Sequence, residues 1–135
     1  MIKKILNLNF IPQNADFALL SLRVGISGLL IVKHGWHKIT DFATLKDHFP
    51  DPLHIGSTLS LLSAIAAENV FSVFLVLGIY ARFAALGLFV NFAVIWALMY
   101  NYSLATDHDE LVGLYLLAYA VLIFSGSGRY SLLRS

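Results

Sequence analysis

Residues 83–102, FAALGLFVNFAVIWALMYNY, decide the fold class, because this stretch of twenty residues contains no charged side chain. A helix needs about 20 mainly apolar residues to cross the hydrocarbon core of a bilayer. Three further apolar stretches, each bounded by polar residues, lie at 15–36, 57–80 and 110–124. The sequence therefore predicts an all-α integral membrane protein whose four spans form a helix bundle.

The composition of the whole chain agrees with this assignment. Of its 135 residues, 59% are hydrophobic and 13% are charged, whereas about 25% of the residues of soluble domains are charged. No linker or charge block divides the chain, so we expect a single membrane domain over residues 1–135. A net charge of +1 gives no reason to expect a nucleic-acid partner. Because the chain has no cysteine, its own residues cannot exchange disulfides or ligate an iron–sulfur cluster.

The connections between the spans predict how neighbouring helices run. The turn at residues 79–82 is so short that the second and third spans must be antiparallel neighbours. Pro50 and Pro52 prevent a continuous helix through the loop at 37–55, although residues 41–46 are compatible with a short interfacial helix. Polar residues interrupt the N-terminal segment before residue 16, so we expect an interfacial segment there rather than a cleaved leader.

The distribution of basic residues predicts the orientation in the membrane. Two basic residues, Lys38 and Lys46, lie on one side, and Lys33 lies at its border. The basic residues predicted on the other side are Lys3, Lys4, Arg82, Arg129 and Arg134. The positive-inside rule therefore predicts that both termini are cytoplasmic.

Each predicted span carries a polar side chain near the middle of the bilayer: Arg23, Glu68, Asn91 and Tyr119. A helical rise of ~1.5 Å per residue places them about 12–18 Å from a membrane surface. Ionisable groups in spans usually face the bundle interior and mark function. We expect Arg23 and Glu68 to form a buried ion pair that hydrogen bonds from Asn91 and Tyr119 would support. Two interpretations stay open, a pair that fixes helix packing and a site for a ligand, proton or quinone.

Histidines gather at the predicted outer end of the bundle. These are His34, His37, His48, His54 and His108. His34 shares the interior-facing stripe of Arg23 and Ser27, so it extends the candidate ligand-binding cluster. His34, His37 and His108, with the acidic turn at 107–110, are weak candidates for a divalent metal site. Hydrogen-bonded interfacial histidines are the more ordinary interpretation. Haem is less favoured still, because no two histidines on different spans share a depth.

Short motifs follow one another along nearly the whole chain. They are LRVG at 22–25, HGWHK at 34–38, Glu68 followed by VLGIYAR at 76–82, Glu110, and GSGRYSL at 126–132. In this order they resemble the DoxX-like family of small membrane proteins. The resemblance implies a four-helix membrane bundle and an association with redox metabolism. The family is similar to a subunit of a thiosulfate:quinone oxidoreductase, and some relatives are described as members of membrane oxidoreductase complexes.

These observations lead to one hypothesis and two alternatives. The leading hypothesis is a quinone-linked redox subunit of a membrane oxidoreductase system, in a bacterial cytoplasmic membrane. The polar side chains would contact the quinone head group, and electrons would come from a membrane-protein partner or a bound cofactor. The first alternative is a non-catalytic interaction or assembly subunit, either with another membrane protein or as a homo-oligomer. The second is a small transporter or proton pathway through His34, Glu68 and Asn91.

Overall fold

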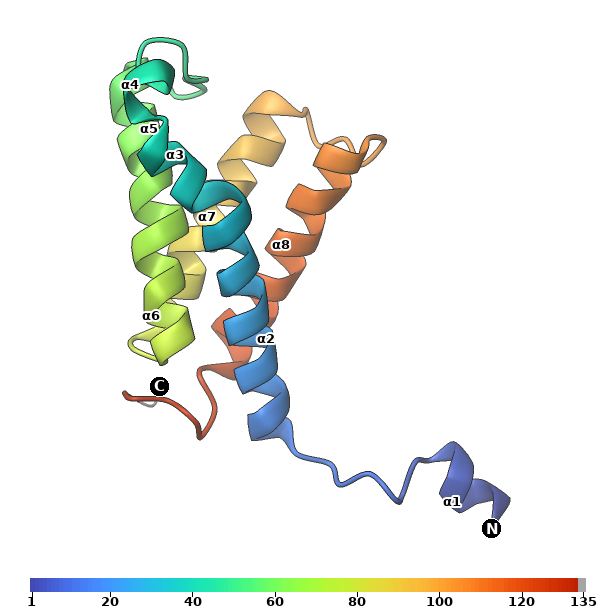
Figure 1. Ribbon diagram of the computed structural model, residues 1–135. Helices are drawn as coiled ribbons and strands as arrows, with labels where there is room; N and C mark the ends of the chain where they lie inside the picture. Colours follow the sequence, from blue (N-terminus) through green and yellow to red (C-terminus); the bar gives the residue numbers. More distant parts are fainter. Residues whose placement is uncertain (134–135) are drawn as a thin grey trace.

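The computed structural model describes residues 1–133, which contain helices and connecting loops but no β-strand. Four helical stretches are long and apolar enough to cross a membrane: Ala15–Thr40, Ser57–Leu77, Ala81–Met99 and Asp107–Ser125. The predicted all-α fold with four spans is confirmed. A short helix, α1 (Ile2–Leu6), precedes the first span and lies away from the bundle (Figure 1). Arg134, which contributed to the predicted orientation, lies outside the described residues.

The first two spans are composite, because a π-helical segment interrupts each of them. The first consists of α2 (Ala15–Leu30), η1 (Ile31–Gly35) and α3 (Trp36–Thr40). The second consists of α5 (Ser57–Ile65), η2 (Ala66–Phe71) and α6 (Ser72–Leu77). Such π segments inside α-helices are rare and occur frequently at functional sites.

The two π segments are tied to each other. Asn69 Nδ2 in η2 donates to the carbonyl oxygens of Gly35 in η1 at 3.1 Å and of Ile65 at 3.0 Å. A Cβ atom on Gly35 would lie 2.5 Å from Asn69 Oδ1. The glycine therefore permits the close approach that sets the first two spans against each other.

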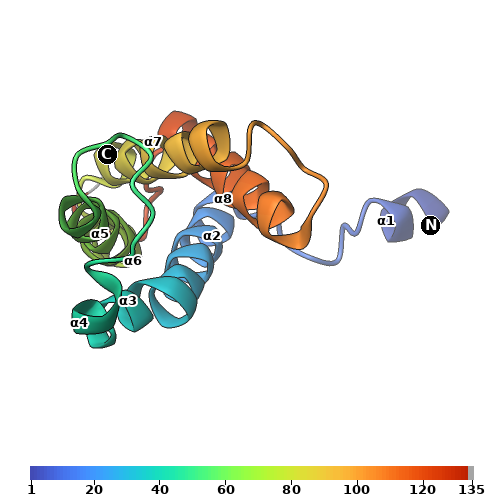
Figure 2. The same ribbon diagram turned by 90° about the horizontal axis from the view of Figure 1, so that it is seen from above.

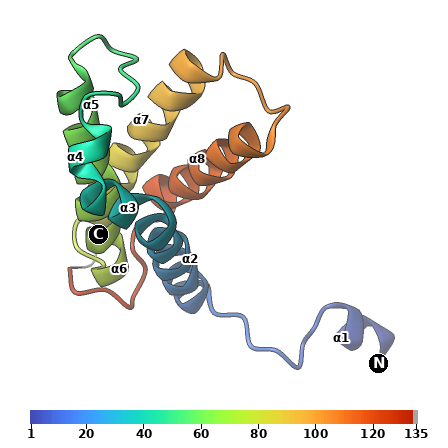
Figure 3. The ribbon, with the colours of Figure 1, turned by 45° about the horizontal axis from the view of Figure 1, so that its top comes forward.

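The third and fourth spans are uninterrupted α-helices, α7 (Ala81–Met99) and α8 (Asp107–Ser125). They pack on each other, and α2 packs against α6 and α8, so that the four spans surround a common interior (Figures 2 and 3). Fully buried leucines fill this interior: Leu30, Leu61, Leu75, Leu88 and Leu122. Large apolar side chains also cover much of the outside of the spans, as expected where lipid is the solvent.

Several span boundaries differ from the prediction because local backbone geometry sets them. The first span continues to Thr40 instead of ending at residue 36. The third begins at Ala81, directly after Tyr80 (φ +46°), and ends at Met99. Asn101 and Tyr102 also have positive φ values, so the chain has already left the helix where the apolar run predicted that the span would end.

Both ends of the described chain lie at the same end of the bundle, which we call the terminal end (Figure 1). The opposite end, the loop end, carries α4 (Phe42–Leu45) and the two longer connections. At the terminal end, residues 126–133 fold back beneath the bundle. The backbone N–H groups of Leu132 and Leu133 donate to the carbonyls of Leu77 and Gly78 at 3.1 and 3.0 Å. That the terminal end is cytoplasmic stays a prediction.

Candidate ligand-binding site

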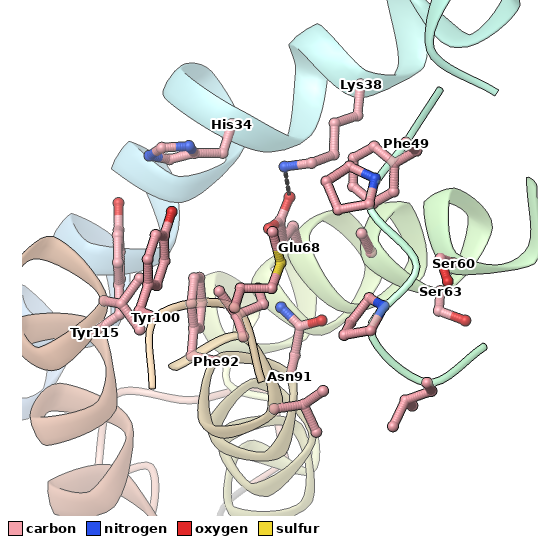
Figure 4. A pocket seen from close by; sticks show the side chains of 18 of the residues that line it. His34, Lys38, Phe49, Ser60, Ser63, Glu68, Asn91, Phe92, Tyr100 and Tyr115 are labelled. Atoms are coloured by element: carbon pink, nitrogen blue, oxygen red, sulfur yellow. Dashed lines mark hydrogen bonds and ion pairs between the residues drawn. The ribbon is translucent and has the colours of Figure 1, made fainter. Parts of the chain in front are cut away.

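A cavity of about 330 Å³ lies in the loop-end half of the bundle. Small-molecule sites in proteins typically have volumes of ~300–1,000 Å³. Residues from all four spans line it, and the connection between the first two spans contributes Phe49, Pro50, Pro52, Leu53 and Ile55 (Figure 4). Most of the lining is apolar, as is usual for sites that bind organic ligands.

A buried ion pair is part of the lining of this cavity. Lys38 Nζ of α3 lies 2.5 Å from Glu68 Oε2 of η2 (Figure 4). The side chains of Lys38 and Glu68 are only 16% and 4% exposed. Glu68 belongs to η2, and Lys38 lies in α3, three residues after the end of η1. The Asn69–Gly35 contact therefore brings together the two segments that carry the charges. The pair supplies strong hydrogen-bonding groups within an apolar enclosure.

Further polar groups face the cavity from the other spans. His34 lies above the edge of the Tyr115 ring, with ring centroids 6.0 Å apart. Tyr115 in turn stacks on Phe92, with centroids 4.9 Å apart and planes 8° from parallel. Asn91 lines the cavity, and its buried Nδ2 atom has no hydrogen-bond partner within residues 1–133. A ligand oxygen would satisfy this donor.

The structure brings three of the five predicted site residues together: His34, Glu68 and Asn91 all line the cavity. Arg23 and Tyr119 are not among the lining residues. Tyr119 is fully buried and stacks on Tyr115, with ring centroids 6.2 Å apart. It therefore lies behind the aromatic wall of the cavity.

The predicted Arg23–Glu68 ion pair is wrong. Arg23 Nη1 donates to the Leu75 carbonyl at 2.7 Å, and Nη2 donates to the Tyr130 carbonyl. Leu75 lies in the last turn of α6, where the helix dipole is negative. Its carbonyl also accepts from the Gly78 N–H at 3.2 Å, and a carbonyl oxygen has two lone pairs, so it can accept from Arg23 as well. The guanidinium is attracted to these carbonyls at the terminal end, and Lys38 takes its predicted place beside Glu68.

Sequence reasoning missed Lys38, Asn69 and the aromatic wall formed by Phe92 and Tyr115. Lys38 was assigned to the loop because the first span was expected to end two residues earlier. One signal was available: Lys38 follows His34 by four residues, which places both side chains on one face if the helix continues. The structure shows that it does continue.

The candidate metal ligands do not form a metal centre in the described part of the chain. No group of three or more His, Cys, Asp or Glu side chains is placed to hold a metal ion among residues 1–133. His34 and His108 line the cavity. His37 is not a lining residue: its Nδ1 atom lies 2.9 Å from Asp41 Oδ2, and the two side chains are 66% and 44% exposed.

Asp51 links the loop at residues 46–56, which lines the cavity, to the start of α5 by hydrogen bonds. Its carboxylate accepts hydrogen bonds from the backbone N–H groups of Ile55 and Gly56 at 2.9 and 2.8 Å. It also accepts one from Ser60 Oγ at 2.8 Å. Desolvation opposes ionisation, but these three hydrogen bonds and the nearby His54 together hold the pKa of Asp51 below its usual range. The loop is thus held by an ionised carboxylate.

The closed loop is expected to be sensitive to acid. Because the pKa of Asp51 is lower in the folded protein, the stabilisation is fully present above the ordinary aspartate value of about 4. It is lost as the pH falls through the lowered pKa. The protection of residues 46–56 against hydrogen exchange, taken relative to the intrinsic exchange rate at each pH, should therefore stay high from pH 7 to 5 and fall below about pH 4. Asp51→Ala should be poorly protected throughout. Loss of protection in the wild type already at pH 5–6 would contradict this assignment.

Comparison with known proteins adds a family to this geometry. The family model of DoxX matches residues 18–101, which is more than half of the chain. The matched region contains both π segments, the ion pair and Asn91. No curated protein and no solved structure matches the chain. The match over three of the four spans confirms the resemblance seen in the sequence motifs, and the chain belongs to the DoxX family.

Proposed function

We propose that this DoxX-family membrane protein is a quinone-linked redox subunit of a membrane oxidoreductase system, and that its cavity binds the quinone head group. The observation that carries the proposal is the buried Lys38–Glu68 pair inside a mostly apolar cavity of about 330 Å³. A quinone head group combines a flat apolar ring with two carbonyl oxygens. It therefore needs this combination of apolar walls and buried hydrogen-bond donors.

The lining offers a role for each part of such a ligand. Phe92 and Tyr115 supply flat aromatic surface beside the ring. Lys38 Nζ and the unpartnered Asn91 Nδ2 are donors for the two carbonyl oxygens. Glu68 and His34 can exchange protons with the ligand, because reduction of a quinone to a quinol takes up two electrons and two protons. No lining side chain is an electron donor, so the electrons come from a partner protein or a bound cofactor.

The proposal includes a location. We place the protein in a bacterial cytoplasmic membrane with the terminal end in the cytoplasm, which the distribution of basic residues supports. The cavity then lies in the half of the membrane away from the cytoplasm. A partner that supplies electrons would approach either from that side or through the membrane.

Asn91→Leu tests the proposal at the ligand. The substitution keeps the branched shape and the number of non-hydrogen atoms of the side chain but removes the donor. A ligand oxygen left unpaired costs ~1–3 kcal/mol, so binding of a short-chain benzoquinone should weaken by about tenfold or more. Binding is measured by titration of the purified protein, together with the quinone content of an organic extract. Val90→Leu is the matched control, because Val90 is exposed on the outside of the same helix.

Two results would overturn this function. Wild-type protein that carries no quinone from its native membrane and does not bind the benzoquinone would exclude a quinone site. Equal binding by wild type and Asn91→Leu would exclude the assigned donor. If the protein carries no quinone but co-purifies with a membrane protein in fixed proportion, the assembly subunit becomes the better interpretation.

A further inference from the structure

Three hydroxyl groups meet in the interior of the bundle, outside the cavity. Ser27 of α2 and Ser72 of α6 are 0% exposed, as is Tyr119 of α8. None of the three hydroxyl oxygens has a hydrogen-bond partner within residues 1–133. Neither serine is among the residues that line the cavity, and nor is Tyr119. They therefore form a separate polar cluster, which we call the hydroxyl cluster.

Both serine side chains lie beside that of Tyr119. Their hydroxyls are close to the Tyr119 hydroxyl but do not meet hydrogen-bonding geometry with it. Ser27 follows Arg23 by one helical turn, and Ser72 precedes Leu75, whose carbonyl accepts a hydrogen bond from Arg23. The Nε atom of Arg23 is also buried without a partner in the described chain. The Nε–H group of Arg23 is thus a fourth buried polar group without a partner, next to the three hydroxyls and on the side of the terminal end.

The energetics of these groups require an explanation. A buried hydroxyl without a partner costs about 1–3 kcal/mol, and the core of a bilayer offers no bulk water to compensate for it. Buried polar groups in native proteins are nearly always bonded either to protein or to ordered water. A water molecule typically makes two to four hydrogen bonds when it is buried, which matches the number of groups in the cluster.

We propose that Ser27, Ser72 and Tyr119 form a binding site for a buried water molecule. Water fits better than an anion, because all three hydroxyls are neutral and Arg23 already directs its charge at two carbonyls. The water bridges α2, α6 and α8 by hydrogen bonds that the three hydroxyls do not make with one another. The site does not depend on the proposed quinone function, since none of its three side chains lines the cavity.

X-ray radiolytic labelling with mass spectrometry tests the site, because a brief X-ray pulse activates bound waters, which then oxidise the side chains that they contact. In the purified full chain, Tyr119 should be oxidised although it is fully buried. The double variant Ser27→Ala with Ser72→Ala should lower Tyr119 oxidation at least fivefold. Oxidation of Tyr115, which faces the cavity, should stay unchanged and reports that the bundle is folded.

Ser63→Ala is the matched control, because Ser63 lines the cavity, outside the hydroxyl cluster, and its hydroxyl donates to the Leu59 carbonyl at 2.9 Å. It should leave Tyr119 oxidation at the wild-type level. If Tyr119 is not oxidised in the wild-type protein, no water is bound at the cluster and the proposal is overturned. This result is expected both for an empty cluster and for one that holds an anion. Unchanged oxidation in a folded double variant would overturn the proposal as well. If the double variant does not fold, Ser27→Ala and Ser72→Ala are compared singly, and each should lower the oxidation.

Discussion

Glu68→Leu is expected to destabilise the bundle by roughly 3 kcal/mol, because removal of one member of a buried ion pair leaves the other charge uncompensated. Lys38 would remain in an apolar cavity with its side chain only 16% exposed. The measurement is reversible unfolding in mixed micelles, compared with the wild type. Lys38→Met should be costly for the same reason, since it leaves the Glu68 carboxylate without its partner.

The double variant Lys38→Met with Glu68→Leu distinguishes a buried pair from two independent polar residues. An apolar pair of similar volume commonly replaces a buried ion pair with little loss of stability. The double variant should therefore be more stable than either single variant. If its loss equals the sum of the two single losses, the two side chains are not coupled. A stable double variant that still binds the benzoquinone normally would remove the ion pair from the proposed site.

Gly78→Ala is the second change with a large expected effect. Gly78 has φ +74°, and an added Cβ would lie 2.3 Å from Ser131 Cβ and 2.8 Å from Arg23 Nη1. The left-handed conformation costs about 1–2 kcal/mol for alanine, and overpacking adds about 1–3 kcal/mol. The variant should thus lose roughly 2–5 kcal/mol of stability, and residues 126–133 should become accessible to protease.

Gly28→Ala is the matched control for this change. It also adds one methyl group to a glycine, but no heavy atom lies within 4 Å of the new Cβ. In the interior of a helix, alanine is favoured over glycine by about 1 kcal/mol, so this variant should be as stable as the wild type or more stable. Equal behaviour of the two variants would show that the terminal segment does not pack against Gly78 as described.

The number and type of the spans could be predicted because they depend on length and apolar composition alone. A run such as residues 83–102 has only one stable arrangement in lipid, since its backbone must satisfy its own hydrogen bonds. The boundaries could not be predicted, because they depend on single backbone conformations. Tyr80 and Asn101 adopt positive φ values that no apolar count reveals.

The candidate site was predicted in part, and the errors have a common origin. Helical rise gives the depth of a residue, and it selected Glu68 and Asn91, which both line the cavity. It does not give the direction in which a long side chain extends. Arg23 extends towards the terminal end and Lys38 towards Glu68. The π segments were also invisible in the sequence. An inserted residue rotates everything after it by about 100°, and a stretch that is apolar on all sides carries no pattern that would show this rotation.

The partners of Arg23 have a consequence for the biogenesis of the protein. The Tyr130 carbonyl that accepts from Arg23 is 107 residues further along the chain. At ~5–20 residues per second, a ribosome needs roughly 5–20 s to make that stretch. During this time α2 carries a cation without its final partners, which costs about 2.5–3.5 kcal/mol at the centre of a span. The nascent first span therefore needs the translocon, an insertase or the membrane interface as a temporary environment, and the bundle can close only after its last segment has been translated.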